Sequence, residues 1–333
     1  GDDRPSRRSR GQADAGWGDL TRHAGFSPFY LPHFAPSTVG KGAGPATDDA
    51  SGRATSNVMG QRAKGEKMYR IFATIALLTM AQAAPNPHLP APTYDNAAPT
   101  LPKNLKQAVL ILSKTNGWRH IEHIPHSNMV LADIAANLGH ASYTTENAAI
   151  FNDEQLRHFS VIILNSASGD FLTEAQRSAF ARFVARGGGV VALHAAGDNS
   201  HKAPWYTGTI IGTKFIGHPG GEDQFQSAQV IVDQPRHPVM AGVTMPWAPV
   251  DEWYSFDANP KMQGMTILAR IDEASYHPGA KLTMGSHPVI WTNPATKGRV
   301  VYSALGHLPE SYDDPNYRRI LTNAIHWAGK FGR

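Results

Sequence analysis

Short, wholly apolar segments alternate with amphipathic segments over the second two thirds of the chain. The apolar runs at 107–113, 160–165 and 190–193 are typical of parallel strands that are buried on both faces. Helices are predicted at 125–138, 173–186 and 314–329, and further strands at 141–145, 228–232, 266–271, 288–291 and 299–303. This alternation predicts an α/β fold, in which helices cover both faces of a parallel sheet. The long stretch 195–265 is rich in Gly, Pro and Trp, and we expect it to form loops that decorate one edge of the sheet.

The N-terminal part of the chain has a different character. Residues 1–67 show no sustained period, and we expect a disordered or non-native leader. From Met68 a short basic start, an apolar run and small residues before Pro85 indicate a signal peptide at 68–84, with a buried helix as the alternative. It is too short to span a membrane. A Pro-rich linker at 85–106 and a domain at 107–329 follow. Because of the signal peptide, we expect a periplasmic or secreted protein.

Composition removes several classes of function. The chain has no cysteine, which excludes disulfides, cysteine–zinc sites and cysteine nucleophiles. The net charge is +4, but residues 1–67 carry most of the basic excess and the rest is almost neutral. Without a basic run in the folded part, a nucleic-acid partner is not favoured.

Histidines and carboxylates follow the predicted strands. In open α/β sheets the ligand binds beyond the carboxyl ends of the strands, so these positions are the candidates for chemistry. Imidazoles act as acids, bases or metal ligands because their pKa lies near neutrality. The candidate catalytic residues are His120, His194, Asp198, Glu252 and His307.

Several motifs, in this order and spacing, give the chain a family resemblance. They are GWRH at 117–120, LNSASGD at 164–170, GGGVVALHAA at 187–196, WY at 205–206, F-x-x-HP at 215–219, DEWY at 251–254, HP at 287–288 and YSALGH at 302–307. The sequence resembles the ThuA-like, or trehalose-utilisation, family over about 107–329. The resemblance implies a flavodoxin-like sheet of the class I glutamine amidotransferase type. His194 stands where amidotransferases have their cysteine, so the resemblance does not carry amidotransferase activity over.

The aromatic residues near these motifs suit a sugar, because flat rings pack on sugar faces beside groups that bind hydroxyls. The candidate substrate-binding residues are Arg119, Trp205, Tyr206, His218, Trp253, Tyr254 and His287. The family's name points to disaccharide catabolism, and related genes imply sugars that are oxidised at a ring carbon. The first hypothesis is therefore an enzyme that acts on a sugar or an oxidised glycoside, with His194 or His120 as base and Asp198 or Glu252 orienting or donating.

Two alternatives stay open at this point. The same residues, together with His218, offer enough nitrogen and oxygen ligands for zinc or a related ion, although no helical pair with ligand spacing is present. A non-catalytic carbohydrate-binding protein is the other alternative. No cofactor is established by the sequence, and it does not decide which histidine is acid or base.

Overall fold

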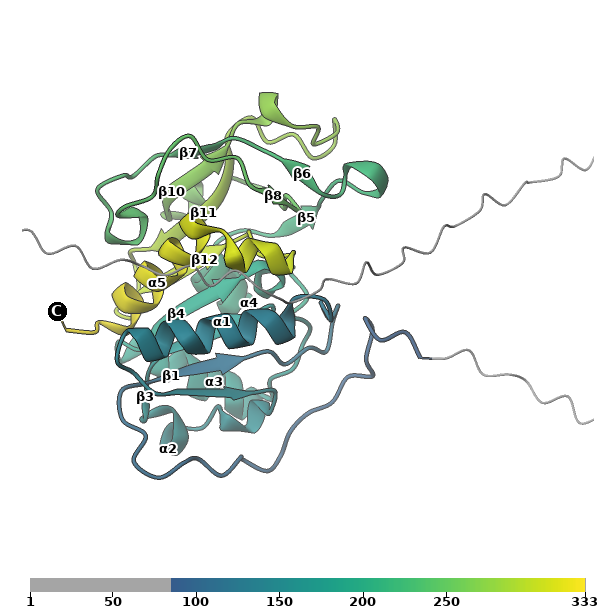
Figure 1. Ribbon diagram of the computed structural model, residues 1–333. Helices are drawn as coiled ribbons and strands as arrows, with labels where there is room; N and C mark the ends of the chain where they lie inside the picture. The colour runs from purple at the N-terminus through teal and green to yellow at the C-terminus, as the bar shows by residue number, and fades with distance from the viewer. Residues whose placement is uncertain (1–84, 333) are drawn as a thin grey trace, which may run out of the picture. The chain divides into compact units, whose positions relative to one another are not determined.

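An eight-stranded sheet forms the centre of the part of the chain that the computed structural model describes, residues 85–332 (Figure 1). The predicted leader at 1–67 and signal peptide at 68–84 lie outside these residues. From edge to edge the strands are β2 (Ser142–Thr145), β1 (Ala108–Leu112), β3 (Phe159–Asn165), β4 (Gly189–Leu193), β12 (Val300–Ser303), β11 (His287–Asn293), β10 (Thr266–Ile271) and β7 (Val230–Val232).

The sheet has a parallel and an antiparallel part. Strands β2, β1, β3, β4 and β12 run parallel, and every residue of β1 and β4 is buried. Strands β11, β10 and β7 extend the sheet antiparallel. The expected fold class is confirmed, but the sheet is mostly rather than entirely parallel. The connections between β10, β11 and β12 contain no crossover helix, so these neighbours pair antiparallel.

Helices cover both faces of the sheet. Figure 1 shows α1 (Ile124–Asn137) and α5 (Pro315–Gly329) in front of the sheet and α3 (Glu174–Ala185) behind it. The start of α3 is fixed by a capping box, in which the Thr173 hydroxyl accepts from the Gln176 backbone and the Gln176 side chain accepts from Thr173. Proline occupies the first turn of both α1 and α5, where its missing N–H costs no helical hydrogen bond. All three helices were predicted within two residues of these bounds.

Residues 85–106, predicted to be a linker, form no helix or strand but are bound to the domain. Lys114 Nζ lies 3.0 Å from the Asp95 carboxylate, and the Asp95 carbonyl accepts from Gln176 Nε2 at 2.9 Å. Thr93 and Asn116 exchange two hydrogen bonds of 3.0 and 2.9 Å. This part of the chain therefore packs along the domain as a fixed strap.

The stretch between β4 and β10 builds short elements on the sheet. Two small antiparallel sheets pair β5 (Phe215–Gly217) with β9 (Ser255–Phe256), and β6 (Gln226–Ser227) with β8 (Val250–Asp251). Two further short α-helices are α2 (Asp153–Leu156), which precedes β3, and α4 (Pro204–Tyr206), which follows β4. Within residues 85–332, none of the helices has the length and apolar character needed to cross a membrane.

Candidate functional site

Three parallel strands and one small sheet deliver the central residues of the site. His120 follows β1, His194 follows β4 directly, and His307 lies four residues beyond β12. Because these strands are parallel, their carboxyl ends meet at one edge of the sheet. Glu252 comes directly after β8, which lies in the loop region above this edge. Residues separated by almost 190 positions in the sequence therefore meet at one place.

These four side chains form a compact cluster. One nitrogen or oxygen atom of each residue lies within 4.8 Å of the corresponding atoms of the others. Nε2 of His194 is 3.2 Å from Nδ1 of His307, which is 2.9 Å from Oε2 of Glu252. The cluster is buried apart from His307, which is partly exposed. Three imidazoles and a carboxylate at this spacing form a donor set that suits a divalent metal ion.

The backbone and a carbonyl oxygen fix His194 within the cluster. Its φ of 47° lies in the left-handed region, which few non-glycine residues adopt, although histidine does so more often than most, and which recurs at active sites. Nδ1 of His194 donates to the carbonyl oxygen of Ala304 at 2.9 Å. Nε2 therefore faces His307 and Glu252, which is the orientation that carbonyl partners impose on metal-binding histidines.

His120 supplies a buried ring nitrogen without a partner. Nδ1 of His120 makes no hydrogen bond among the described residues, and the residue is 3% exposed. Burial, and then the neighbouring imidazoles of His194, His123 and His307, lower the pKa of His120, so that its ring is neutral. A buried neutral nitrogen that lacks a donor is destabilising unless a cation or a water molecule binds it.

Glu252 and His194 influence each other's protonation. Burial disfavours the charged form of His194, but the hydrogen bond and charge of Glu252 outweigh it, so the pKa of His194 is raised. Burial likewise favours protonated Glu252, but its contacts with His194 and His307 outweigh that effect and lower its pKa. The carboxylate is therefore negative and attracts positive charge to the centre of the cluster.

Asp251, which the sequence analysis did not single out, holds the two loops that carry Glu252 and His307. Its buried carboxylate accepts from the backbone nitrogens of Gly306 at 2.8 Å, His307 at 3.0 Å and Glu252 at 2.8 Å. It also accepts from the Ser311 hydroxyl at 3.0 Å. One carboxylate thus sets the relative position of two members of the cluster.

His123 was also missed as a site residue. It is fully buried, its Nδ1 donates to the carbonyl oxygen of His307 at 2.7 Å, and its Nε2 lies 2.9 Å from the Ser166 hydroxyl. The ring therefore supports the His307 backbone from behind the cluster. Its position three residues after His120, just before the predicted helix at 125–138, was the signal that could have found it.

A pocket of about 760 Å³ opens onto the cluster. Its wall includes His120, Glu252 and His307, together with the predicted residues Asp198, His218 and Tyr254. The volume lies within the range of about 300–1,000 Å³ that is usual for small-molecule sites. The pocket can therefore bring a substrate of sugar size into contact with the cluster.

Asp198 lies in the wall of this pocket, outside the cluster, and its pKa is shifted toward neutral pH. Burial raises its pKa to about 6, against hydrogen bonds from Ser200 that lower it. A carboxyl group with such a pKa is suited to exchange a proton near neutral pH.

His218 and Tyr254 complete the polar surroundings of the cluster. Nδ1 of His218 is 3.3 Å from Glu252, which also accepts from Gln224 Nε2 at 2.7 Å. The ring of Tyr254 lies 4.4 Å from that of His194. Burial, followed by the charge of Glu252, raises the pKa of Tyr254, so its hydroxyl stays neutral and can donate a hydrogen bond.

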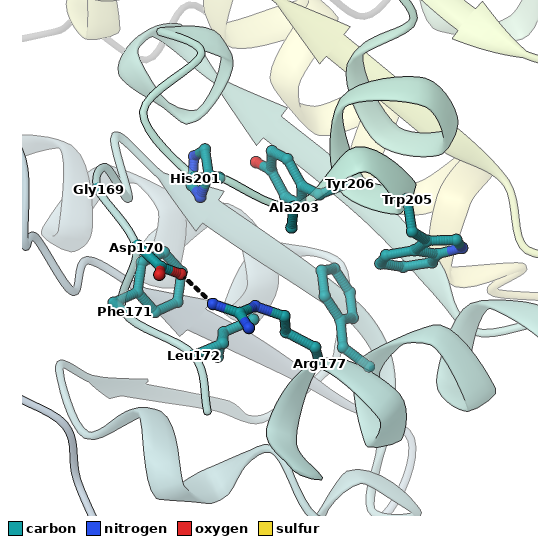
Figure 2. A pocket seen from close by; sticks show the side chains of 10 residues that line it. Gly169, Asp170, Phe171, Leu172, Arg177, His201, Ala203, Trp205 and Tyr206 are labelled. Atoms are coloured by element: carbon teal, nitrogen blue, oxygen red, sulfur yellow. Dashed lines mark hydrogen bonds and ion pairs between the residues drawn. The ribbon is translucent and has the colours of Figure 1, made fainter. Parts of the chain in front are cut away.

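Trp205 and Tyr206 lie elsewhere. They line a separate cavity of about 10 Å³, which Figure 2 shows beside the ion pair of Asp170 and Arg177. The Tyr206 hydroxyl donates to the Ala196 carbonyl at 2.6 Å. The cavity has room for about one water molecule, so neither ring is placed to contact a ligand at the cluster.

Three more of the predicted substrate-binding residues are not in the pocket wall. Trp253 is buried and donates from Nε1 to the Gln226 carbonyl at 2.8 Å. His287 is buried against Glu273 at 2.8 Å, and Arg119 pairs with Glu146 at 2.6 Å. These contacts occupy polar groups of the three side chains outside the pocket wall.

The fold and the site together define an α/β protein of the flavodoxin-like class, with a histidine–carboxylate centre at the carboxyl edge of its parallel strands. The chain belongs to the ThuA family. The model of that family, described as trehalose utilisation, matches residues 108–328. No curated protein matches the chain.

Solved structures agree with this assignment. A ThuA-like protein from Bacteroides uniformis is 24% identical with a TM-score of 0.58, and the match covers 70% of this chain and 95% of that one. A second ThuA-like protein, from Parabacteroides merdae, is 18% identical with a TM-score of 0.54, and covers 67% of this chain and 90% of that one. At these identities the likeness concerns the fold.

Proposed function

We propose that this protein is a metal-dependent enzyme that acts on a sugar or an oxidised glycoside. The observation that carries the proposal is the convergence of His120, His194, His307 and Glu252, whose donor atoms lie within 4.8 Å of one another. Ligands of this kind, one carboxylate and three imidazoles, favour zinc or a related divalent ion. The unpartnered Nδ1 of His120 supports the same conclusion.

A divalent ion held there would supply Lewis acidity toward an oxygen atom of the substrate. The residues of the chain supply the rest of the chemistry. Asp198, with its raised pKa, accepts a proton from the substrate when ionised and returns it when protonated. The Tyr254 hydroxyl remains a donor and orients a substrate oxygen. A 3-keto glycoside fits this scheme. Asp198 would take the proton from the C–H bond beside the carbonyl, the resulting enolate would expel the glycosidic oxygen, and Asp198 would return the proton to that oxygen.

The nature of the pocket and the family description support a sugar as the substrate. Aromatic side chains and hydrogen-bonding groups share the wall, and sugars present both an apolar face and hydroxyls. The description of the matching family is trehalose utilisation. We also propose that the reaction takes place in the periplasm or outside the cell, on the basis of the signal peptide predicted at 68–84.

Metal analysis of the full chain tests the metal centre. Protein purified without chelator should contain close to one divalent ion per chain, and His120→Ala and His307→Ala should lose it. His326→Gln, on α5 away from the cluster, is the matched control and should keep the wild-type content. An ion content near zero in the wild type, with turnover of a 3-keto disaccharide unaffected by chelator, would contradict the proposal.

A metal-free acid–base enzyme is the second candidate function. The raised pKa of His194 favours it, because an imidazolium beside Glu252 can balance the carboxylate without a metal. In that case His194 would act as the acid, and turnover would survive complete removal of metal. Activity that is lost with chelator and restored by zinc decides against this candidate.

A further inference from the structure

The exposed part of the pocket wall differs in character from the cluster. Trp118 is 43% exposed and Phe225 is 40% exposed, and both line the pocket, whereas His120 and Glu252 in the cluster are buried. Leu308, which is partly buried, lines the pocket as well. We call Trp118, Phe225 and Leu308 the outer apolar surface. Large apolar side chains that gather in contact with water indicate a place where an apolar group binds.

Contacts with neighbouring rings hold the two aromatic side chains of this surface in place. The imidazole of His88 stacks on the indole of Trp118, with ring centroids 4.8 Å apart and planes 14° apart. His88 is itself fixed, because its carbonyl oxygen accepts from the backbone nitrogen of Arg119 at 2.8 Å and its Nδ1 donates to the carbonyl oxygen of Arg119 at 2.9 Å. Phe225 contacts the ring of His307 edge-on at 4.9 Å. Both rings are therefore preorganised, which lowers the entropic cost of binding a ligand.

The polar groups beside the outer apolar surface already have partners. Nδ1 of His88 is bonded to Arg119, and Nε2 of His88 lies 3.4 Å from the carboxylate of Glu122. Gln224, which precedes Phe225 and also lines the pocket, donates from Nε2 to Glu252 at 2.7 Å. Sugar hydroxyls placed on this surface would exchange several hydrogen bonds to water for few to the protein, which is unfavourable. An apolar ring carries no such cost.

The fixed charges of the pocket wall are negative. The carboxylates of Glu122, Asp198 and Glu252 line the pocket, and among the described residues its wall contains neither lysine nor arginine. The proposed metal ion would balance Glu252, but Glu122 stands at the outer end of the wall with its side chain half exposed. A carboxylate or phosphate group at that end would be repelled.

We infer that the outer apolar surface binds an uncharged aryl aglycone, so that the substrate is an aryl glycoside rather than a saccharide of two sugar rings. The sugar ring reaches the cluster, and the aryl ring packs on Trp118 and Phe225. A pocket of about 760 Å³ has room for both rings. The inference rests on the proposed function, because it takes the group at the cluster to be a sugar.

Calorimetric titration of the metal-loaded full chain tests the inference. The probes are methyl, phenyl and 4-carboxyphenyl glucosides in both anomers, together with trehalose. Their 3-keto forms are titrated into Asp198→Asn, which lacks the proposed base and should not consume them. We expect phenyl glucoside to bind at least about tenfold more tightly than methyl glucoside, and more tightly than trehalose, because the aryl ring leaves water. The 4-carboxyphenyl glucoside should bind about fivefold more weakly than the phenyl glucoside.

Variants separate the two parts of the inference. Trp118→Ala should bring phenyl and methyl glucoside to within about twofold of each other and leave the affinity for methyl glucoside unchanged, whereas Trp118→Phe should retain most of the preference. Glu122→Gln should narrow the difference between phenyl and 4-carboxyphenyl glucoside to about twofold. Tyr94→Ala is the matched control, since Tyr94 is an exposed aromatic residue of the strap that does not line the pocket, and it should bind like the wild type. The metal content should be unchanged in Trp118→Ala, Glu122→Gln and Tyr94→Ala.

Each contrary result overturns the inference. Equal affinity for methyl and phenyl glucoside would show that the outer apolar surface binds no aryl ring, and trehalose binding more tightly than phenyl glucoside would assign the surface to a sugar. Loss of both affinities in parallel in Trp118→Ala would assign the indole to the inner ring instead. If no probe binds in either form while the metal content stays at one ion per chain, the inference fails and the metal centre stands. A metal content near zero would instead contradict the proposed metal centre, and the order of the glucoside affinities would still decide the inference.

Discussion

Replacing Asp251 with asparagine should damage both the stability of the fold and the proposed metal centre, although the two side chains have nearly the same shape. All four of its partners are donors. Oδ2 accepts from the Gly306 nitrogen and the Ser311 hydroxyl, and Oδ1 accepts from the His307 and Glu252 nitrogens. The asparagine amide has one oxygen and one NH₂ group, so the NH₂ group must face one of these two pairs of donors.

The magnitude follows from these contacts. The serine hydroxyl can rotate and accept from the new NH₂ group, but the N–H of Gly306 cannot and becomes a buried donor without an acceptor. That costs about 1–3 kcal/mol. The hydrogen bonds that remain at Oδ1 lose their charge assistance, which adds about 1 kcal/mol or more. We therefore expect Asp251→Asn to lower the free energy of unfolding by about 2–4 kcal/mol.

Urea unfolding of metal-free protein gives the stability, and metal titration gives the affinity. The loops of His307 and Glu252 lose their common support, so metal affinity should fall by about 10–100-fold, as is usual for residues that orient ligands. Asp313→Asn is the matched control, since its side chain is 60% exposed and its contact with His126 contributes little. A change below about 1 kcal/mol in Asp251→Asn, with metal affinity within twofold of the wild type, would refute the reasoning.

Three further predictions concern pH and packing. The pKa of Glu252 is lowered in the folded protein, so its contribution to stability is present above the ordinary carboxylate range and is lost as pH falls through its pKa in the folded state. The pKa of His194 is raised, so its contribution is present below about 6.5 and is lost as pH rises through its pKa in the folded state. Metal-free protein should thus be most stable between these limits in urea unfolding, and Glu252→Gln should flatten the profile. If Asp198 is the base, kcat/KM should fall as pH drops through about 6, and a pH–rate profile of Asp198→Asn should lack this limb. Gly169→Ala should destabilise the protein by at least about 2 kcal/mol, because a Cβ there would clash with the backbone nitrogen of Gly117 at a φ of +78°. Gly139→Ala, with a similar φ of +80° and no atom within 4 Å of the added Cβ, should cost less in the same unfolding assay.

Strands β1, β3 and β4 were predictable because they are short apolar runs separated by helices, and the start of α3 carries a clear capping signal. The apolar run at 160–165 and the helix expected at 173–186 correspond closely to β3 and α3. The direction of the last strands was not predictable in the same way. Apolar runs look alike in parallel and antiparallel pairs, and only the connections between them determine which pairing forms.

The candidate site was likewise predictable only in part. His120, His194 and His307 were predicted from their positions after strands, and the rule of the carboxyl edge brings such residues together. The carboxyl-edge rule does not place residues in the loop region 195–265. It also does not identify aromatic side chains whose polar atoms are hydrogen-bonded to the backbone. Trp253 and His287 carry the same residue types as a binding site but are buried by structural contacts. Asp251 stands in the DEWY motif at 251–254, but its role was not predicted, because the sequence does not show which backbone and hydroxyl groups a carboxylate accepts from.

The strap at 85–106 has a consequence for how this protein can diversify. It lies outside residues 108–328, the part that the family model matches, and yet it supplies His88 to the pocket. The cluster is assembled mainly at the edge of the sheet, whereas this wall of the pocket comes from a segment that forms no helix or strand and is joined to the loop before His120 by hydrogen bonds. Exchange of that segment alone would alter the shape of the pocket entrance and leave the strands that hold the histidines intact. Under the proposed function, the strap would contribute to the selection of the substrate and the sheet would carry the chemistry, so the two properties would depend on separate pieces of the chain.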